Sequence, residues 1–426
     1  MYKLRLSQNW LVVLVGFAAL AISFSSRGAL SLAMPLWKLE FNWSRSLTSS
    51  IAASAMLVMA VVAPFAGNAV DRYGPRRLLA IGLLMVGTAM LLVASINSPS
   101  QFWLLVVGFG LIGGLGFGIV AQHVVATAIA ARFVRNRGLA TGIGTAGSTA
   151  GQVLVLPLLA ATFAAGAWRW GFIGLGALSV SLCPLVLLMV RMQSNGAGQP
   201  DEAHPTASVA PQSLRRRIAL MATNRSFHLL FWSYLICGFT TSGVIETHFL
   251  PFASLCGFGP VPGATAYGVL CAINLGGMIT AGWLTDRIHR PTLLAAIYFA
   301  RALCFVLLMF VDLSYPKLML FAVLFGAFDY STVPVTAGLL ARNMGVNMLG
   351  LSMGVLSAAH AVGGALGAMI GGYLFDRLGN YDALWYTSIG LALAAAAMAA
   401  LINDTSGTAH PFDASRNRSV KAATPS

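Results

Sequence analysis

Three charged residues, Arg27, Arg301 and Asp329, lie inside long apolar runs of this 426-residue chain. A charge near the centre of a bilayer costs at least about 2.5–3.5 kcal/mol, so each is a candidate for function. Arg27 suits a carboxylate, which a guanidinium binds bidentately; the alternative is that its side chain extends to the membrane interface. We expect Arg301 and Asp329 at the same depth, as a structural ion pair or as a proton-linked switch.

Uncharged polar side chains in the apolar runs form a second group. Gln122, Asn274 and His360 are predicted to contact a substrate, with bridging between helices as the alternative. The same alternatives apply to His123 and Gln152, which are weaker candidates. Each of these side chains can donate or accept hydrogen bonds in a water-poor environment.

One further histidine, His248, lies near the end of its apolar run and is a candidate for proton coupling, because histidine titrates in the physiological range. Solvation by water is the alternative. The five cysteines show no CxxC spacing, and paired carboxylates, a nucleophile motif and a metal-ligand cluster are not evident. The sequence therefore predicts neither an enzyme, a cofactor nor a metal site.

The composition indicates which solvent surrounds these candidates. Hydrophobic residues make up 58% of the chain and charged residues 9%, against roughly a quarter charged in soluble domains. Disordered chains are poor in apolar residues, which excludes that class. A nucleic-acid binder would carry its arginines on a soluble face, which excludes that class too. The expected environment is a lipid bilayer.

Twelve apolar runs reach the length of about 20 residues that a helix needs to cross the hydrocarbon layer. Strand alternation is absent, so we predict an all-α membrane protein. The first run follows Lys3 and Arg5, as a secretion signal does, but it is too long and lacks a cleavage site, so it is predicted to be retained. The runs are 9–35, 47–67, 78–97, 101–125, 138–164, 169–191, 227–252, 264–284, 291–312, 316–340, 347–372 and 384–403.

The net charge of +14 reports topology. If the N-terminus is cytoplasmic, 19 of the 26 basic residues fall on the cytoplasmic side, 5 fall outside, and two lie within spans. This bias predicts that both termini are cytoplasmic. We expect a six-helix bundle over 1–192, a flexible cytoplasmic linker over 193–226, a second six-helix bundle over 227–405 and a disordered tail over 406–426. The linker ends in Arg215-Arg216-Arg217, for which a regulatory or lipid-headgroup role is an alternative.

The two halves resemble each other at a nearly constant offset. The segment Gly67–Arg72 matches Gly282–Arg287, 215 positions later, and Gly138 matches Gly350. Arg27 aligns with Ser242. Parallel six-helix repeats predict two pseudo-symmetric bundles related by an axis along the membrane normal, with a binding site between them near the midplane.

The repeated segment has a physical interpretation. Glycine lets a neighbouring helix approach closely, and an aspartate among arginines makes charge-assisted bonds. We predict a latch that joins the two halves on the cytoplasmic side; the alternative is that the charges only set topology. The predicted latch residues are Gly67, Asp71, Arg72, Arg76, Asp286 and Arg287.

The segment from Gly67 to Arg77 resembles the signature loop between helices 2 and 3 of the major facilitator superfamily. Further pieces, including Arg137-Gly138 at the start of the fifth run and Pro251 in the seventh, are similar to the monocarboxylate-porter branch and its bacterial relatives. The resemblance implies the major facilitator fold and transport of small carboxylates with protons. It also implies a basic residue on the first helix, matched by Arg27; the branch's arginine on the eighth helix has no counterpart here.

These observations predict a secondary transporter of a small organic anion, monocarboxylate-like and proton-coupled, that works by alternating access in the cell membrane. A nucleotide-binding GxxxxGK[ST] loop is absent, so ATP does not drive it directly. The expected partners are the substrate, protons and the lipid bilayer, and the protein is expected to be a monomer. The alternative is a drug/proton antiporter on the same fold, although Gln152 stands where that class carries a proline.

Overall fold

The computed structural model describes residues 2–133, 135–194, 213–312 and 314–404, and these residues form helices without strands. Within these ranges twelve segments are long and apolar enough to cross a membrane, which confirms the all-α prediction. In lipid, backbone groups must bond within their own segment, and helices satisfy this requirement. The expected tail over 406–426 and linker residues 195–212 lie outside the described residues.

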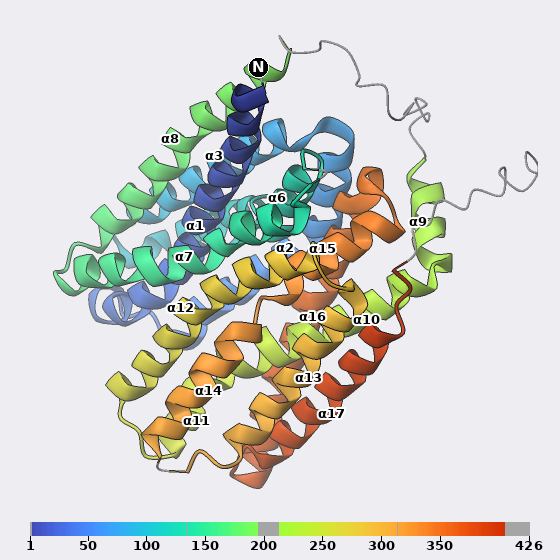
Figure 1. Cartoon of the computed structure of the whole chain (residues 1–426). Helices are drawn as coiled ribbons and strands as arrows, with labels where there is room; N and C mark the ends of the chain where they lie inside the picture. Colours follow the sequence, from blue (N-terminus) through green and yellow to red (C-terminus); the bar gives the residue numbers. More distant parts are fainter. Residues whose placement is uncertain (1, 134, 195–212, 313, 405–426) are drawn as a thin grey trace, which may run out of the picture.

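The first six spans form one bundle (Figure 1). The fourth span consists of several consecutive helical pieces. The elements of this N-terminal half are α1 (Tyr2–Phe41), α2 (Arg45–Tyr73), α3 (Pro75–Ala94), η1 (Pro99–Gln101), α4 (Phe102–Leu105), η2 (Val106–Gly113), α5 (Gly114–Ile119), α6 (Gln122–Ala130), α7 (Arg137–Ala164) and α8 (Trp168–Ser194).

The last six spans form the second bundle, and its seventh and tenth spans are also built from consecutive pieces. The elements of this C-terminal half are α10 (Arg225–Gly238), η3 (Phe239–Ile245), α11 (Glu246–Leu255), α12 (Pro260–Thr285), α13 (Arg290–Leu308), α14 (Tyr315–Phe328), α15 (Thr332–Asn343), η4 (Val346–Met348), α16 (Leu349–Leu378) and α17 (Asp382–Ala400).

The fourth and seventh spans depart from regular α-helix near their middle. The segments η2 and η3 are π-helical, a geometry that is frequent at functional sites. Between α5 and α6 the backbone opens at Val120 and Ala121, and the Ser23 hydroxyl donates to the freed Val120 carbonyl at 3.0 Å. Irregular backbone at membrane depth is tolerated where it is buried in protein or lines a cavity.

The linker contains a further helix, α9 (Leu214–Thr223), at one end of the molecule (Figure 1). Ser213 caps it, because its side chain accepts a hydrogen bond from the Arg216 backbone N–H. Arg217 on this helix is buried, with 4% of its surface exposed. We call the side of the molecule that carries α9 and the end of α2 the linker side, and the opposite side the distal side.

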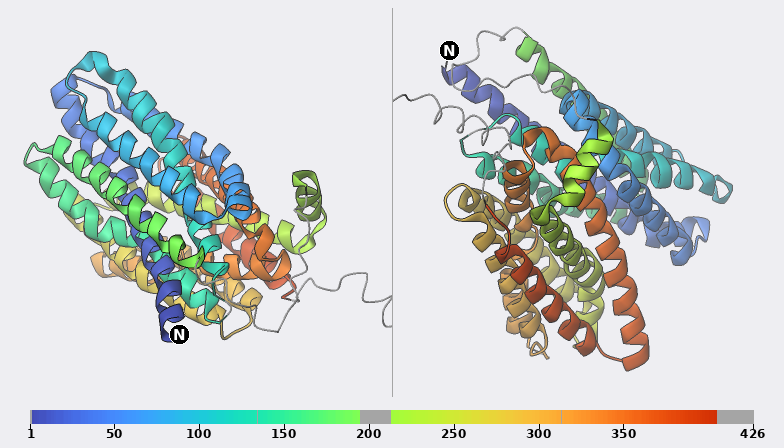
Figure 2. Two further views of the ribbon diagram at one scale, coloured as in Figure 1. Left: turned by 90° about the horizontal axis from the view of Figure 1, so that it is seen from above. Right: turned by 90° about the vertical axis from the view of Figure 1, so that its right-hand side faces the viewer.

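The two halves contact each other mainly toward the linker side. The principal pairs are α2 with α16, α7 with α12 and α15, and α6 with α15 and α16. Glycines allow this approach: a Cβ on Gly67 would meet the Gly350 carbonyl, and a Cβ on Gly138 would meet the Gly282 carbonyl. Toward the distal side the bundles diverge (Figure 2).

Candidate functional site

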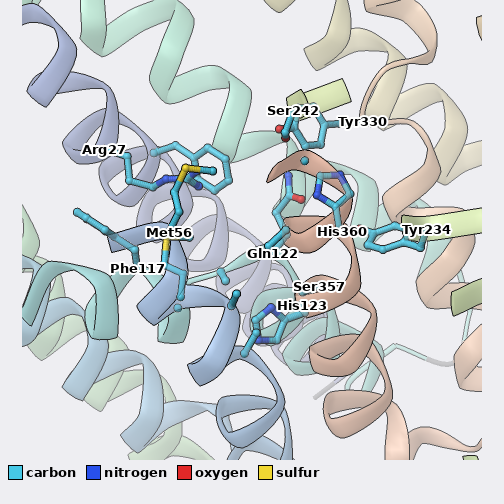
Figure 3. A pocket seen from close by; sticks show the side chains of 18 residues that line it. Arg27, Met56, Phe117, Gln122, His123, Tyr234, Ser242, Tyr330, Ser357 and His360 are labelled. Atoms are coloured by element: carbon cyan, nitrogen blue, oxygen red, sulfur yellow. The ribbon is translucent and has the colours of Figure 1, made fainter. Parts of the chain in front are cut away.

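A cavity of about 120 Å³ lies between the two halves and receives side chains from both (Figure 3). The first, second and fourth spans line it from the N-terminal half, and the seventh, tenth and eleventh from the other half. Its lining mixes apolar and polar groups, the arrangement typical of small-molecule sites. The polar side chains used below are Arg27, Gln122, His123, Ser242, Tyr330 and His360.

Arg27 extends into this cavity from α1 and is half-buried (Figure 3). Its guanidinium carbon lies 4.7 Å from the centre of the Phe24 ring. Among the described residues, the Arg27 guanidinium has no hydrogen-bond or ion-pair partner. It also borders a second, largely apolar pocket of about 210 Å³ that includes Met56, Phe109 and Gln152. The N–H donors of the Arg27 guanidinium are therefore available to an anion.

Two of the other predicted substrate-binding residues also line the cavity. Gln122, at the start of α6, donates to the Ser148 hydroxyl at 2.8 Å and so also ties α6 to α7. His360 lines the opposite wall on α16, with its ring 5.2 Å from that of Tyr234. These two side chains face each other across the halves (Figure 3).

Asn274 lies elsewhere, because it bridges helices and is not among the residues that line the cavity. Its side chain is 2% exposed, and its Oδ1 accepts a hydrogen bond from the Tyr330 backbone N–H at 3.2 Å. This bond satisfies a donor at the break between α14 and α15. The Tyr330 ring in turn lines the cavity, and its hydroxyl donates to Glu246 at 2.6 Å.

Arg301 and Asp329 lie together in a fully buried cluster outside the cavity. Their closest N and O atoms are 3.9 Å apart. Arg301 donates to the Cys237 sulfur at 3.1 Å and to the hydroxyls of Thr240, at 3.0 Å, and Thr241. The Thr241 hydroxyl donates to Asp329 at 3.0 Å. The carboxylate and guanidinium are thus joined directly and through one shared hydroxyl, and the next residue after Asp329 lines the cavity.

His248 packs within the C-terminal half instead of facing the cavity. It is 7% exposed, and its Nε2 lies 3.1 Å from the Ala368 carbonyl oxygen. Its ring contacts that of Tyr381 at 5.5 Å. The histidine therefore joins the seventh span to the eleventh and the twelfth.

Asp71, at the end of α2, is bound across the interface between the halves. Its two oxygens accept hydrogen bonds from the backbone N–H groups of Gly350 and Leu351, at 2.8 and 2.9 Å. These N–H groups begin α16, where the partial positive charge of the helix end favours a carboxylate. Arg217 of α9 completes the site with an ion pair to Asp71 and a 2.6 Å bond to Asn68.

Asp286 repeats this arrangement at the other interface. It accepts hydrogen bonds from the backbone N–H groups of Gly138 and Leu139, at the start of α7, at 2.8 and 2.9 Å. The arginines of the predicted latch are placed differently. Arg287 is exposed, with its guanidinium carbon 4.0 Å from the centre of the Trp283 ring.

The other two predicted latch arginines also lie away from the aspartates' hydrogen bonds. Arg72 is exposed. Arg76 lines a small separate cavity within the N-terminal half, together with Arg132. Among the described residues, the aspartates therefore bind backbone N–H groups of the opposite half, and the paired arginine comes from the linker.

The sequence did not predict the positions and contacts of three residues, for a different reason in each case. Arg217 was seen only as part of a basic triplet, and its pairing depends on how α9 folds back. Ser242 was identified as the repeat counterpart of Arg27, which was a usable signal, because it lines the same cavity. Tyr330 gave no signal, since nothing in an apolar run marks where its helix breaks.

Three comparisons show what this chain is similar to. It matches the family model described as Major Facilitator Superfamily over residues 16–367 and 281–424. It is 27% identical over 380 residues to the "Uncharacterized MFS-type transporter YcxA" of Bacillus subtilis (strain 168), covering 88% of this chain and 90% of that protein. It is 25% identical over 399 residues to Monocarboxylate transporter 11 of Homo sapiens, covering 90% and 81%.

Among solved structures, the proton:xylose symporter XylE bound to 6-bromo-6-deoxy-D-glucose superimposes with a TM-score of 0.69. The sequence identity is 16%, and the superposition covers 94% of this chain and 98% of that chain. The likeness is one of fold.

Proposed function

Because the chain belongs to the major facilitator superfamily, and is thus a multi-pass membrane transporter and not an enzyme, we propose that it carries a small organic anion of the monocarboxylate type, coupled to protons. The similarity to Monocarboxylate transporter 11 supports the substrate class. The family model supports secondary transport, in which the two halves rock about a central site.

The observation that carries this proposal is the free guanidinium of Arg27 in the cavity between the halves. Within the described part of the chain it has no carboxylate partner, so a carboxylate substrate supplies the missing charge. An arginine–carboxylate pair forms two parallel hydrogen bonds. Gln122 and His360 then contact the same substrate from opposite halves, which links binding to the relative position of the halves.

We assign the linker side to the cytoplasm of the cell membrane, because basic residues concentrate there. The cavity then opens to the outside, and Asp71 and Asp286 hold the cytoplasmic side closed. We further assign proton coupling to the cluster of Arg301 and Asp329. Protonation of Asp329 removes the charge that faces Arg301, which changes how the ninth and tenth spans pack.

Uptake into proteoliposomes tests the anion assignment. Purified protein is assayed with radiolabelled lactate, pyruvate and dicarboxylates under an inward proton gradient, beside Arg27→Gln and, as a matched control, Arg377→Gln at an exposed distal position. We expect Arg27→Gln to lower kcat/KM for at least one acid by about ten- to a hundredfold, the value of hydrogen bonds to a charged group. Full activity of Arg27→Gln overturns the assignment.

A drug/proton antiporter is the second candidate. The apolar pocket beside Arg27, which includes Met56 and Phe109, favours a larger amphipathic substrate. Efflux of a cationic dye from loaded vesicles under an inward proton gradient separates the two functions. An antiporter exports the dye as protons enter down their gradient, and an organic-anion carrier leaves the dye inside.

A further inference from the structure

His123 forms part of the closed end of the central cavity. It lies in the second position of α6, and Figure 3 shows it below Arg27 and Gln122. The residue is 2% exposed. Its Nε2 is buried and makes no hydrogen bond of standard geometry to a described residue, although the Ala63 backbone carbonyl lies beside the ring. A buried polar atom without a partner is destabilising, so its retention beside a cavity points to a ligand that satisfies it.

Two neighbouring polar groups of the same cavity are already engaged. The Gln122 side chain donates to Ser148 at 2.8 Å, and the Tyr330 hydroxyl donates to Glu246 at 2.6 Å. Arg27 and His123, by contrast, each retain a donor or acceptor that makes no hydrogen bond of standard geometry to a described residue. Two unsatisfied groups in one cavity define two points of attachment for one ligand.

These two points lie at different depths in the membrane. The hydrogen bond from Ser23 to the Val120 carbonyl places those residues level with each other. At 1.5 Å of rise per residue in α1, Arg27 is about 6 Å nearer the distal side than Ser23. His123 lies on the other side of this level, because it follows Val120 toward the linker side after the extended residue Ala121. A ligand that contacts both side chains therefore needs polar groups at its two ends, not on adjacent carbons.

We infer that His123 binds a hydroxyl group at the far end of the substrate, while Arg27 binds its carboxylate. This inference rests on the proposed function. A hydroxyl suits either tautomer of the imidazole, because it both donates and accepts. A second carboxylate would bring an unpaired charge to a buried position, which is costly. The substrate class is a small carboxylic acid with a terminal hydroxyl, and His123 is its specificity-determining residue.

Three four-carbon acids that differ only in their hydroxyl test the inference: butyrate, 4-hydroxybutyrate and 2-hydroxybutyrate. The full-length protein in proteoliposomes should prefer 4-hydroxybutyrate to butyrate by about tenfold in kcat/KM, because butyrate leaves Nε2 unpaired. The 2-hydroxy acid should gain little over butyrate. His123→Leu should bring the preference below about twofold while butyrate transport persists, and His123→Gln should restore part of it. His228→Leu, at an exposed position, is the matched control.

The outcomes separate the two proposals. If the wild-type protein carries both acids equally well and Arg27→Gln abolishes both, the role of His123 is overturned and the proposed function stands. If the wild-type protein carries neither acid nor any other carboxylate, both are overturned. Where His123→Leu does not fold, ligand-induced thermal shifts of the wild-type protein with the three acids give the same comparison, because a ligand that binds only the folded state raises Tm.

Discussion

Asp71 and Asp286 make the same pair of contacts at the two interfaces between the halves. Each carboxylate accepts two successive backbone N–H bonds, at 2.8 and 2.9 Å, from the beginning of a helix in the opposite half. The internal repeat in the sequence is therefore matched by the same pair of hydrogen bonds at each interface between the halves. The symmetry is broken by Arg217, which forms an ion pair with Asp71 alone among the described residues.

This asymmetry predicts different costs for neutralising the two aspartates. Asp71→Asn leaves the Arg217 side chain, 5% exposed, without its counter-ion, which costs about 3–5 kcal/mol of stability. Asp286→Asn weakens only two backbone bonds and costs about 1–3 kcal/mol. Thermal unfolding in detergent should therefore give a lower Tm for Asp71→Asn. Combining it with Arg217→Met should recover part of the loss; equal Tm values for the two single variants would contradict this account.

Arg217→Ala should release α9 from the body of the protein. The substitution removes the bonds to Asn68, Asp71 and the Asn347 carbonyl. Hydrogen–deuterium exchange of the amides over 214–223 should accelerate, because a helix of this length is marginal without tertiary contacts. Arg216→Ala, which changes an exposed neighbour, is the control, and equal exchange in the two variants would refute the docking role of Arg217.

A methyl group on Gly67 should prevent full closure of the linker side. Its Cβ would overlap the Gly350 carbonyl, a backbone group that cannot rotate away. Spin labels on the distal ends of α1 and α11, at the exposed positions 39 and 255, should report a shorter distance in Gly67→Ala as the distal side closes. Gly372→Ala, on α16 with open space around it, should leave the distance distribution unchanged.

Asp329→Asn should uncouple transport from protons. The substitution keeps the shape of the buried cluster but removes the carboxylate that lies 3.9 Å from Arg301 and to which we assign proton coupling. We expect proton-driven uptake to be lost while exchange of labelled for unlabelled substrate continues. Uptake measured across external pH provides the test: an unchanged pH dependence in Asp329→Asn would remove this residue from the coupling mechanism.

The sequence was sufficient to predict the architecture, because each membrane-spanning helix is a long apolar segment that can be recognised in the sequence. Every expected apolar run overlaps one of the twelve spans, since length and hydropathy alone determine what crosses a bilayer. The match of Gly67–Arg72 with Gly282–Arg287 likewise identified the positions where the halves approach each other.

The partners of these residues could not be read from the sequence. Asp71 was expected to bind neighbouring arginines, yet it binds backbone N–H groups about 280 positions away, and backbone donors leave no compositional signal. Asn274 and Gln122 are both polar residues in apolar runs, but only Gln122 lines the cavity. The side of a helix that a residue occupies depends on the local breaks, as at Val120, which periodicity does not predict.

The divergence of the two bundles also has a consequence for the membrane around them. Halves that touch at one end and separate at the other make a tapered body, which occupies more area in one leaflet than in the other (Figure 2). If the halves rock during transport, the taper reverses, so each cycle transfers lateral area between the leaflets. The balance of lateral pressure between the leaflets then contributes to the free-energy difference between the two ends of the cycle.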